Sequence, residues 1–223
     1  MISCYHLTID GPDEGRPLLD DVSFELEDGD WVEFVGPTGA GKSLLFSVLT
    51  LENRPTEGRL VVGGRNLERL DRTGFAELRR DIGSCRQAPE LLEERNVIEN
   101  LVVPLLVRGE TRRAAEVGER LLESCRLAAL REAPVGRLSD GERHLVGLLR
   151  AVIGTPRLVA VDGGLDALSG DALESARQAL TDSYESGSSI VLFGRSASGI
   201  APDGATLFEV EAGRVDRASE EEP

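Results

Sequence analysis

This chain of 223 residues is 40% hydrophobic, so it is long enough to bury the core of one domain, or of one domain with an inserted subdomain. Its formal net charge of −15 argues against unaided nucleic-acid binding, because contacts with a phosphate backbone need a basic surface. No apolar stretch approaches the roughly 18 residues of a membrane-spanning helix, and the first residues lack the basic and then apolar pattern of a signal peptide.

The first half of the chain reads as strands around one buried helix. Loose alternation in residues 1–30 predicts short antiparallel strands. The run WVEFV at 31–35 predicts a strand that leads into a glycine-rich turn, and the almost entirely apolar run at 43–51 predicts a buried helix. A turn, a strand and a Gly-Gly hairpin are expected in 53–67, and a further short strand in 81–87.

The second half begins with a change of character. Residues 90–150 read mostly as helices with arginine and glutamate on their outer faces, which predicts a helical subdomain. Strands return at 157–161, 189–193 and 206–210, with a helix near 170–186 between the first two. The order strand, helix, strand implies a parallel sheet.

The cysteines and histidines give no sign of a metal site. Cys4, Cys85 and Cys125 are far apart and form no CxxC pair, which predicts reduced, buried thiols in a cytosolic protein. The two histidines, His6 and His144, have no partner at metal-ligand spacing, so we expect both at the surface or on a helix face.

Residues 36–43, GPTGAGKS, fit the pattern G-x-x-x-x-G-K-[ST] between a predicted strand and a predicted helix, which is the context of a phosphate-binding loop. Glycines let backbone N–H groups turn towards phosphate oxygens, and the helix N-terminus adds partial positive charge. Lys42 is the one lysine among 25 basic residues, and its ammonium can reach the β and γ phosphates, while the Ser43 hydroxyl can bind Mg²⁺. The predicted binding residues are Gly36, Pro37, Thr38, Gly39, Ala40, Gly41, Lys42, Ser43 and Leu44.

Four further stretches make residues 1–215 similar to the ATP-binding subunits of ABC transporters. IGSCRQ resembles the approach to the family's Q-loop and puts Gln87 at the glutamine position. RLSDGERHLVGLLRAV resembles the signature motif and its helix, RLVAVDGGLDALSG the Walker B strand and D-loop, and SSIVLFGRS the switch-histidine strand. The sequence after the Q-loop is most similar to that of the subgroup that serves cell division, lipoprotein release and MacB-type mechanotransmission.

The resemblance implies an α/β fold, the ABC type of P-loop NTPase, with a RecA-like core, an antiparallel β subdomain and an inserted α-helical subdomain. We expect one nucleotide-binding domain over 1–215. Its core and β subdomain would occupy about 1–88 and 151–215, and its helical subdomain about 89–150, with a loose acidic tail at 216–223. The resemblance also implies ATP as the ligand.

The stretch that resembles Walker B departs from the family's Asp-Glu-Pro. Asp162 is present and is expected to hold Mg²⁺ together with Ser43 and Gln87, but Gly163 replaces the glutamate and a second glycine replaces the proline. That glutamate orients or deprotonates the attacking water, and glycine cannot do so. Asp166 is a poor stand-in, because an ungapped reading points it elsewhere. We therefore predict no catalytic residue, and hydrolysis that is slow or dependent on a partner subunit.

Other positions of the ATP site depart as well. Arg195 stands at the switch-histidine position and, being always charged, cannot be a neutral acceptor. Ser169 replaces the D-loop aspartate, Leu44 replaces a second hydroxyl after Ser43, and Tyr5 lies too early to be the aromatic that stacks on adenine. We expect weakened base stacking and one weakened phosphate contact.

The signature-like stretch LSDGE retains Ser139 and Gly141, while Asp140 and Glu142 replace a glycine and a glutamine. In the family this loop caps the γ-phosphate of ATP held by the other subunit. The resemblance therefore assigns all four residues to the opposite subunit's site, and Asp140 slows closure if its charge faces that phosphate.

Three functional interpretations stay open. The chain is an ATP-binding subunit of an ABC transporter with impaired hydrolysis, a non-hydrolysing ATP-gated regulatory or scaffolding subunit, or an active ATPase with an unrecognised base. The first two imply a membrane-spanning partner subunit, contacted by residues 88–110, and a peripheral place on the cytoplasmic face of the cell membrane. The resemblance also implies a homodimer, or a heterodimer with another ABC ATP-binding subunit, and no nucleic-acid partner.

Overall fold

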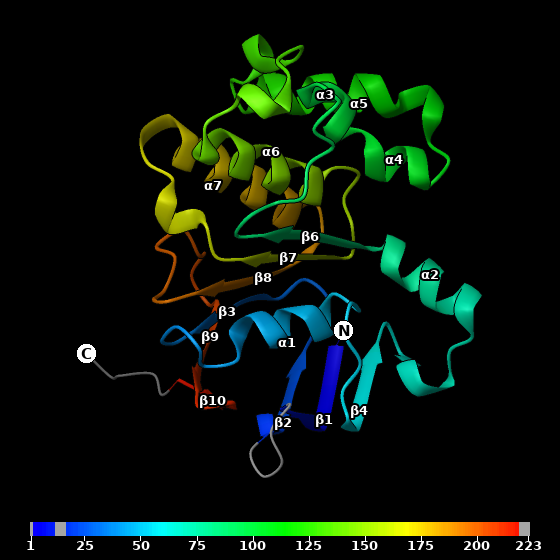
Figure 1. The fold of residues 1–223 in the computed structure, drawn as a ribbon, viewed down its shortest axis with the longest axis vertical. Helices are drawn as coiled ribbons and strands as arrows, with labels where there is room; N and C mark the ends of the chain where they lie inside the picture. Colours follow the sequence, from blue (N-terminus) through cyan, green and yellow to red (C-terminus); the bar gives the residue numbers. More distant parts are fainter. Residues whose placement is uncertain (1, 12–16, 219–223) are drawn as a thin grey trace. The chain divides into compact units, whose positions relative to one another are not determined.

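The computed structural model describes residues 2–11 and 17–218. By its internal contacts the chain divides into two compact units, which are Met1–Arg79 with Ser189–Pro223, and Arg80–Ser188. Figure 1 shows the helices and strands of each unit.

An antiparallel sheet of the first unit has the strand order β2 (Pro17–Leu26), β1 (Ile2–Asp10), β4 (Glu57–Val62) and β5 (Arg65–Asn66). Buried and exposed residues nearly alternate along β2, as expected for a sheet with one face on the core. The register of β1 against β2 shifts between Cys4 and Leu7. His6 there and Asp21 on β2 both have positive φ, which is typical of bulged strands.

A second set of strands in this unit carries the glycine-rich loop. β3 (Trp31–Val35) lies between β8 (Ser189–Gly194) and β9 (Thr206–Glu211) and is parallel to both, while β10 (Arg214–Arg217) pairs antiparallel with β9. Phe34 stacks on Phe193 and Phe208, with ring centroids 5.0 and 5.2 Å apart. Phe46 of α1 (Lys42–Leu49) meets Phe193 edge-on. This aromatic core fixes the strand before the loop and the helix after it.

In the second unit, β6 (Ile82–Arg86) and β7 (Leu158–Asp162) form a parallel pair. Figure 1 shows α6 (Asp140–Val152) and α7 (Gly170–Glu185) beside these strands. A Cβ atom on Gly83 would lie 1.8 Å from the carbonyl oxygen of Ala151, so only glycine lets β6 approach α6 this closely.

The helical part of this unit contains three further helices, α3 (Val97–Leu101), α4 (Val103–Val107) and α5 (Thr111–Ser124). Helix α2 (Arg72–Arg80) lies where the two units meet in the sequence. Short 3₁₀ turns occupy Leu67–Arg69, Ala128–Leu130, Val135–Arg137 and Leu165–Ala167.

Most elements confirm the sequence predictions, including the Gly-Gly hairpin between β4 and β5. Within the stretch 90–150, which was predicted to be mostly helical, residues 97–107 form two helices, because α4 starts anew with Pro104 in its first turn. The predictions missed α2, in which only Leu78 is buried, and β10. The expected tail overlaps β10, which ends at Arg217, and residues 219–223 lie outside the described part.

The three cysteines are free and buried, as predicted. Among the described residues, no helix combines the length and the apolar character needed to cross a bilayer. His6 is exposed, and His144 lies on a helix face, as expected, but that face is buried and leaves 3% of the His144 surface exposed. The helix face that carries it is turned towards the core of the second unit.

Candidate functional site

The glycine-rich loop before α1 has the backbone that its motif predicts. Gly39 and Gly41 have φ values of 83° and 107°, in the left-handed region that favours glycine, and Gly41 caps α1. A Cβ atom on Gly36 would lie 2.0 Å from the carbonyl oxygen of Val210. The loop thus needs glycine for its conformation at two positions and for close packing at a third.

Lys42 closes the loop on itself. Its Nζ donates hydrogen bonds to the carbonyl oxygens of Gly36 and Pro37, at 2.6 and 2.7 Å, so the ammonium lies within the curve of the loop. Thr38 and Ser43 are exposed at its surface. Backbone N–H groups, a helix N-terminus and a cation together form a site suited to phosphate groups.

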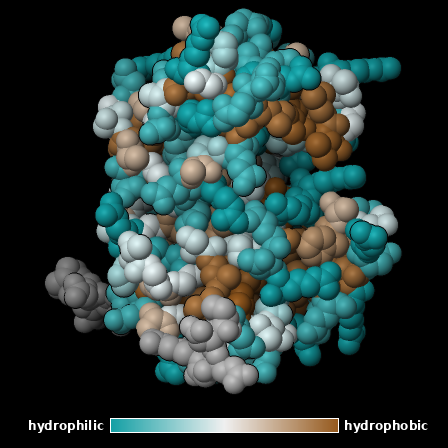
Figure 2. Space-filling view, viewed as in Figure 1, coloured by the Kyte–Doolittle hydropathy of each residue, from teal (hydrophilic) through white to brown (hydrophobic). Residues whose placement is uncertain are grey.

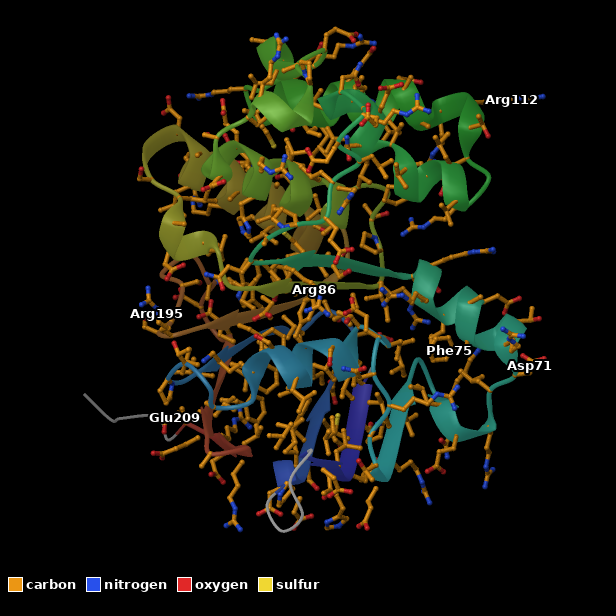
Figure 3. The ribbon with its side chains drawn as sticks, in the orientation of Figure 1. Asp71, Phe75, Arg86, Arg112, Arg195 and Glu209 are labelled. Carbon is orange, nitrogen blue, oxygen red and sulfur yellow. The ribbon has the colours of Figure 1, made fainter. Side chains whose placement is uncertain are left out.

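In the second unit, the parallel register brings two further candidates together. Arg86 lies opposite Asp162, so Gln87 follows at the end of β6 where Asp162 ends β7; Figure 3 labels Arg86. A Cβ atom on Gly163 would lie 3.6 Å from Cβ of Gln87. The structure therefore places Gln87 beside the turn that follows Asp162.

A carboxylate, an amide oxygen and a hydroxyl are hard oxygen ligands that suit Mg²⁺, which keeps several waters and binds substrate phosphates. Asp162, Gln87 and Ser43 offer this donor set. No cluster of three or more His, Cys, Asp or Glu side chains able to hold a metal occurs in the described part of the chain. Taken one by one, these three side chains have the chemistry of magnesium ligands.

The turn after Asp162 offers no carboxylate. Gly163 and Gly164 have φ values of 69° and 83°, so two successive residues adopt the left-handed conformation. Asp166 follows in a 3₁₀ turn, Leu165–Ala167, and is exposed. Burial lowers the pKa of the His144 imidazole, and the Gln87 backbone and the negative charge of Asp166 offset only part of that effect.

The stretch LSDGE forms the start of α6. Ser139 caps the helix and forms a capping box with Glu142: the serine Oγ accepts from the Glu142 N–H, and its N–H donates to the Glu142 carboxylate at 2.8 Å. Bonds from the Ser139 hydroxyl and backbone lower the pKa of Glu142. Asp140 and Gly141 lie in the first turn, where an acidic residue suits the helix dipole.

Comparison with known proteins identifies the family. Residues 19–164 match the family model described as ABC transporter, which is more than half of the chain. The chain belongs to the ABC transporter family. Methionine import ATP-binding protein MetN from Cupriavidus metallidurans is 33% identical over 199 residues, covering 88% of this chain and 58% of the relative. MetN 2 from Rhodopseudomonas palustris is 32% identical over 219 residues, covering 96% of this chain and 58% of the relative.

Solved structures of ABC cassettes share the fold. A dimeric post-hydrolysis state of the ATP-binding cassette MJ0796, bound to ADP and Pi, has a TM-score of 0.87 at 24% identity and covers both chains completely. A second structure, of an ATP binding subunit of an ABC transporter, has a TM-score of 0.84 at 22% identity, covering 99% of this chain and 90% of the other. These likenesses confirm the predicted fold class. The methionine importer subunits are not named for any function of the predicted subgroup, and the chain spans 58% of their length, so the finer subgroup placement stays a prediction.

Arg195, at the family's switch position, lies exposed on the loop that follows β8 (Figure 3). Nearby on this loop, Ser198 is anchored by the buried carboxylate of Glu33 on β3. The Ser198 N–H donates to Glu33 Oε2 at 2.8 Å and its hydroxyl donates to Oε1, while the Trp31 indole also donates to Oε1, at 3.4 Å. At the D-loop position, Ser169 is exposed and caps α7 without a side-chain hydrogen bond.

Three side chains near these motifs make contacts that the sequence did not predict. His144 is packed against the Asp162–Gly164 turn, and burial lowers the pKa of its imidazole, an effect that the Gln87 backbone and Asp166 partly offset. Arg143 binds Glu93 in the segment after the Q-loop, at 2.5 Å. Glu33 had a signal, since it is a charged residue inside the apolar strand WVEFV. The other two had none, because their contacts come from distant parts of the sequence.

Proposed function

We propose that this chain binds ATP with Mg²⁺ as the ATP-binding subunit of an ABC transporter, or of a transporter-like membrane complex, and that its own hydrolysis is slow. The Gly163–Gly164 turn carries the proposal. Both residues lack a side chain and hold left-handed backbone, so neither can orient a water. The next carboxylate, of Asp166, is exposed and lies in the 3₁₀ turn Leu165–Ala167 that follows the two glycines.

The phosphate loop supplies the binding function. Its N–H groups and the start of α1 would accept the phosphates, and Lys42 would exchange the carbonyl oxygens of Gly36 and Pro37 for phosphate oxygens. Ser43, Gln87 and Asp162 would hold the magnesium, which neutralises phosphate charge and fixes the phosphates' orientation. Binding therefore needs no residue that the turn after Asp162 has lost.

Exposed apolar side chains support a membrane-spanning partner. Leu92, in the segment after Gln87, is 48% exposed, and Leu106 and Val107 at the end of α4 are 45% and 57% exposed. Figure 2 shows an apolar area over α4. We propose that residues 88–110 contact the partner, which would hold this chain on the cytoplasmic face of the membrane.

The signature residues Ser139 and Gly141 would serve ATP held by a second ATP-binding subunit. A homodimer would have no carboxylate directly after Asp162 in either site, so ATP would drive closure with little turnover. A heterodimer partner with complete motifs would make one active composite site, in which this chain supplies the signature. The subdomain boundaries predicted near residues 88 and 151 are part of this proposal.

ATP turnover by the purified chain tests the proposal. Loss of a water-positioning group costs about 10²–10⁴-fold, so we expect a rate far below the enzyme median of about 10 s⁻¹. Binding of Mg-ATP should persist in the wild type, and Lys42→Ala should weaken it. A turnover near 10 s⁻¹ would show that another residue acts as the base, and failure of the wild type to bind ATP would refute the proposed function.

Purification of the native complex and cross-linking test the partners. A complex with two copies of this chain and no second ATP-binding subunit would rule out the heterodimer. A cysteine introduced by Leu106→Cys should cross-link to a membrane-spanning subunit, since the chain's own cysteines are buried. Arg112→Cys, on the exposed start of α5 (Figure 3), is the matched control and should not. Cross-links to soluble proteins alone would contradict a membrane partner.

A further inference from the structure

His144 fills the space beside the turn that replaces the family's Glu-Pro pair. It lies on α6 and is almost completely buried. A Cβ atom on Gly164 would lie 2.1, 2.4 and 2.5 Å from Cε1, Nε2 and Nδ1 of its ring. With this backbone, His144 therefore excludes every side chain at position 164.

The same face of α6 also holds the approach to the Q-loop. The ring of His144 is close to the backbone of Gln87, and the Cys85 thiol points to the carbonyl oxygen of His144 at 3.9 Å. One turn along α6, a Cβ atom on Gly147 would lie 2.4 Å from Cβ of Pro89. Helix α6 is thus packed at close range against the segment that carries Gln87 and against the turn that follows Asp162.

Hydrogen bonding does not explain why a histidine stands here. Within the described residues, neither ring nitrogen of His144 forms a hydrogen bond of ordinary geometry, and the contact with the Gln87 backbone is a weak one that only partly offsets the effect of burial. A buried polar group without partners is unfavourable, so this ring needs another reason to be tolerated. Its volume and its contact with Gly164 supply one.

We propose that His144 is a positioning residue: its ring replaces the packing that Gly163 and Gly164 no longer provide and holds the turn after Asp162 in place beside Gln87. The part of the proposal that concerns magnesium rests on the proposed function, and the packing part does not. One consequence concerns the repair of the motif. A Glu-Pro pair cannot be restored at 163 and 164 while His144 is present, because position 164 has no room.

A double-mutant cycle tests the packing. Gly164→Ala alone should lower the melting temperature strongly, and His144→Ala should lower it less. The double variant should melt higher than Gly164→Ala alone, because the new methyl group enters the space of the lost ring. Gly163→Ala is the matched control: it has the same left-handed backbone, but its Cβ would contact Gln87, so its effect should add to that of His144→Ala. Additive effects at Gly164, or a double variant that folds no better than Gly164→Ala, would overturn the proposal.

Nucleotide binding tests the positioning of the magnesium ligands. Affinity for trinitrophenyl-ATP is measured with Mg²⁺ and with EDTA. His144→Ala should weaken binding about tenfold with Mg²⁺ and leave binding in EDTA unchanged, since a tenfold change is the size expected when a supporting group of a metal site is removed. His144→Met, which fills the space without ring nitrogens, should recover most of the loss.

An equal loss with Mg²⁺ and with EDTA, or no loss at all, would overturn the positioning role. A His144→Met variant as weak as His144→Ala would overturn the packing explanation. If the wild type binds no nucleotide, the proposed function fails together with the magnesium part of this proposal, and the melting cycle still decides the packing part.

Discussion

The phosphate loop and the Asp162–Gly164 turn both depend on glycine, but different contacts hold them. The loop closes through Lys42, whose ammonium binds the carbonyl groups of residues five and six positions earlier. The turn is packed against Gln87 and His144, which come from other elements of the second unit. The loop thus combines closure by its own lysine with packing of Gly36 on Val210, whereas the contacts at the two glycines of the turn come from Gln87 and His144.

The largest expected effect concerns the loop. Lys42→Ala should weaken Mg-ATP binding by about 100-fold or more, because charged hydrogen bonds to phosphates are worth about 1.5–3 kcal/mol each. Isothermal titration calorimetry measures it, with Arg112→Ala as an unaffected control. The affinity of Lys42→Arg for Mg-ATP should lie between those of the wild type and Lys42→Ala, since a planar guanidinium cannot fully replace a compact ammonium. Unchanged affinity in Lys42→Ala would show that the loop is not a nucleotide site.

The next effect concerns the packing on α6. Gly147→Ala should lower the free energy of unfolding by about 1–3 kcal/mol, because its Cβ would overlap Pro89. Gly141→Ala on the same helix is the control: its Cβ would lie 3.8 Å from Leu168, and alanine favours helix, so no loss is expected. Urea unfolding measures both variants. Equal stabilities would mean that the Q-loop segment is not packed tightly on this helix.

Gly163→Glu tests whether the absence of a carboxylate at position 163 is by itself enough to make hydrolysis slow, or whether the changed turn also matters. The position has room, but a φ of 69° should destabilise the fold by about 1–2 kcal/mol. ATP turnover should stay low if His144 holds the turn as proposed and Arg195 stands at the switch-histidine position as predicted. Gly163→Ala gives the backbone effect without the charge. A turnover restored by Gly163→Glu alone would show that the rest of the turn is functional.

The smallest effect is a pH dependence at the start of α6. Ser139→Ala should cost about 0.5–2 kcal/mol at neutral pH through loss of the cap. Hydrogen bonds from Ser139 lower the pKa of Glu142 in the folded protein below its ordinary value of 4.5. The ionised Glu142 carboxylate therefore contributes to the free energy of unfolding at pH values above its unfolded pKa, and this contribution is lost as the pH falls through its folded pKa. The stability difference between wild type and Ser139→Ala should therefore shrink at acid pH. A difference independent of pH would show that Glu142 does not take part in the cap.

The phosphate loop, Asp162 and the start of α6 were predictable because each is a local pattern: a strand, a turn and a helix that follow one another in the sequence. The burial of His144 was not, since its spacing on α6 is that of an exposed residue as much as of a buried one until Gly164 is placed against it. Helix α2 was missed for a related reason, because it buries only Leu78 and so lacks a strong apolar period.

The buried carboxylate of Glu33 fixes one end of the short loop segment that contains Arg195. β8 ends directly before Arg195, and Ser198 is fixed to Glu33 through both its N–H and its hydroxyl. An extended residue spans at most about 3.3–3.6 Å, so the few residues between these anchors leave the backbone at Arg195 little room to move. Since Glu33 lies on β3, the strand that runs into the glycine-rich loop, one buried carboxylate ties the loop after β8 to the strand before the candidate phosphate site.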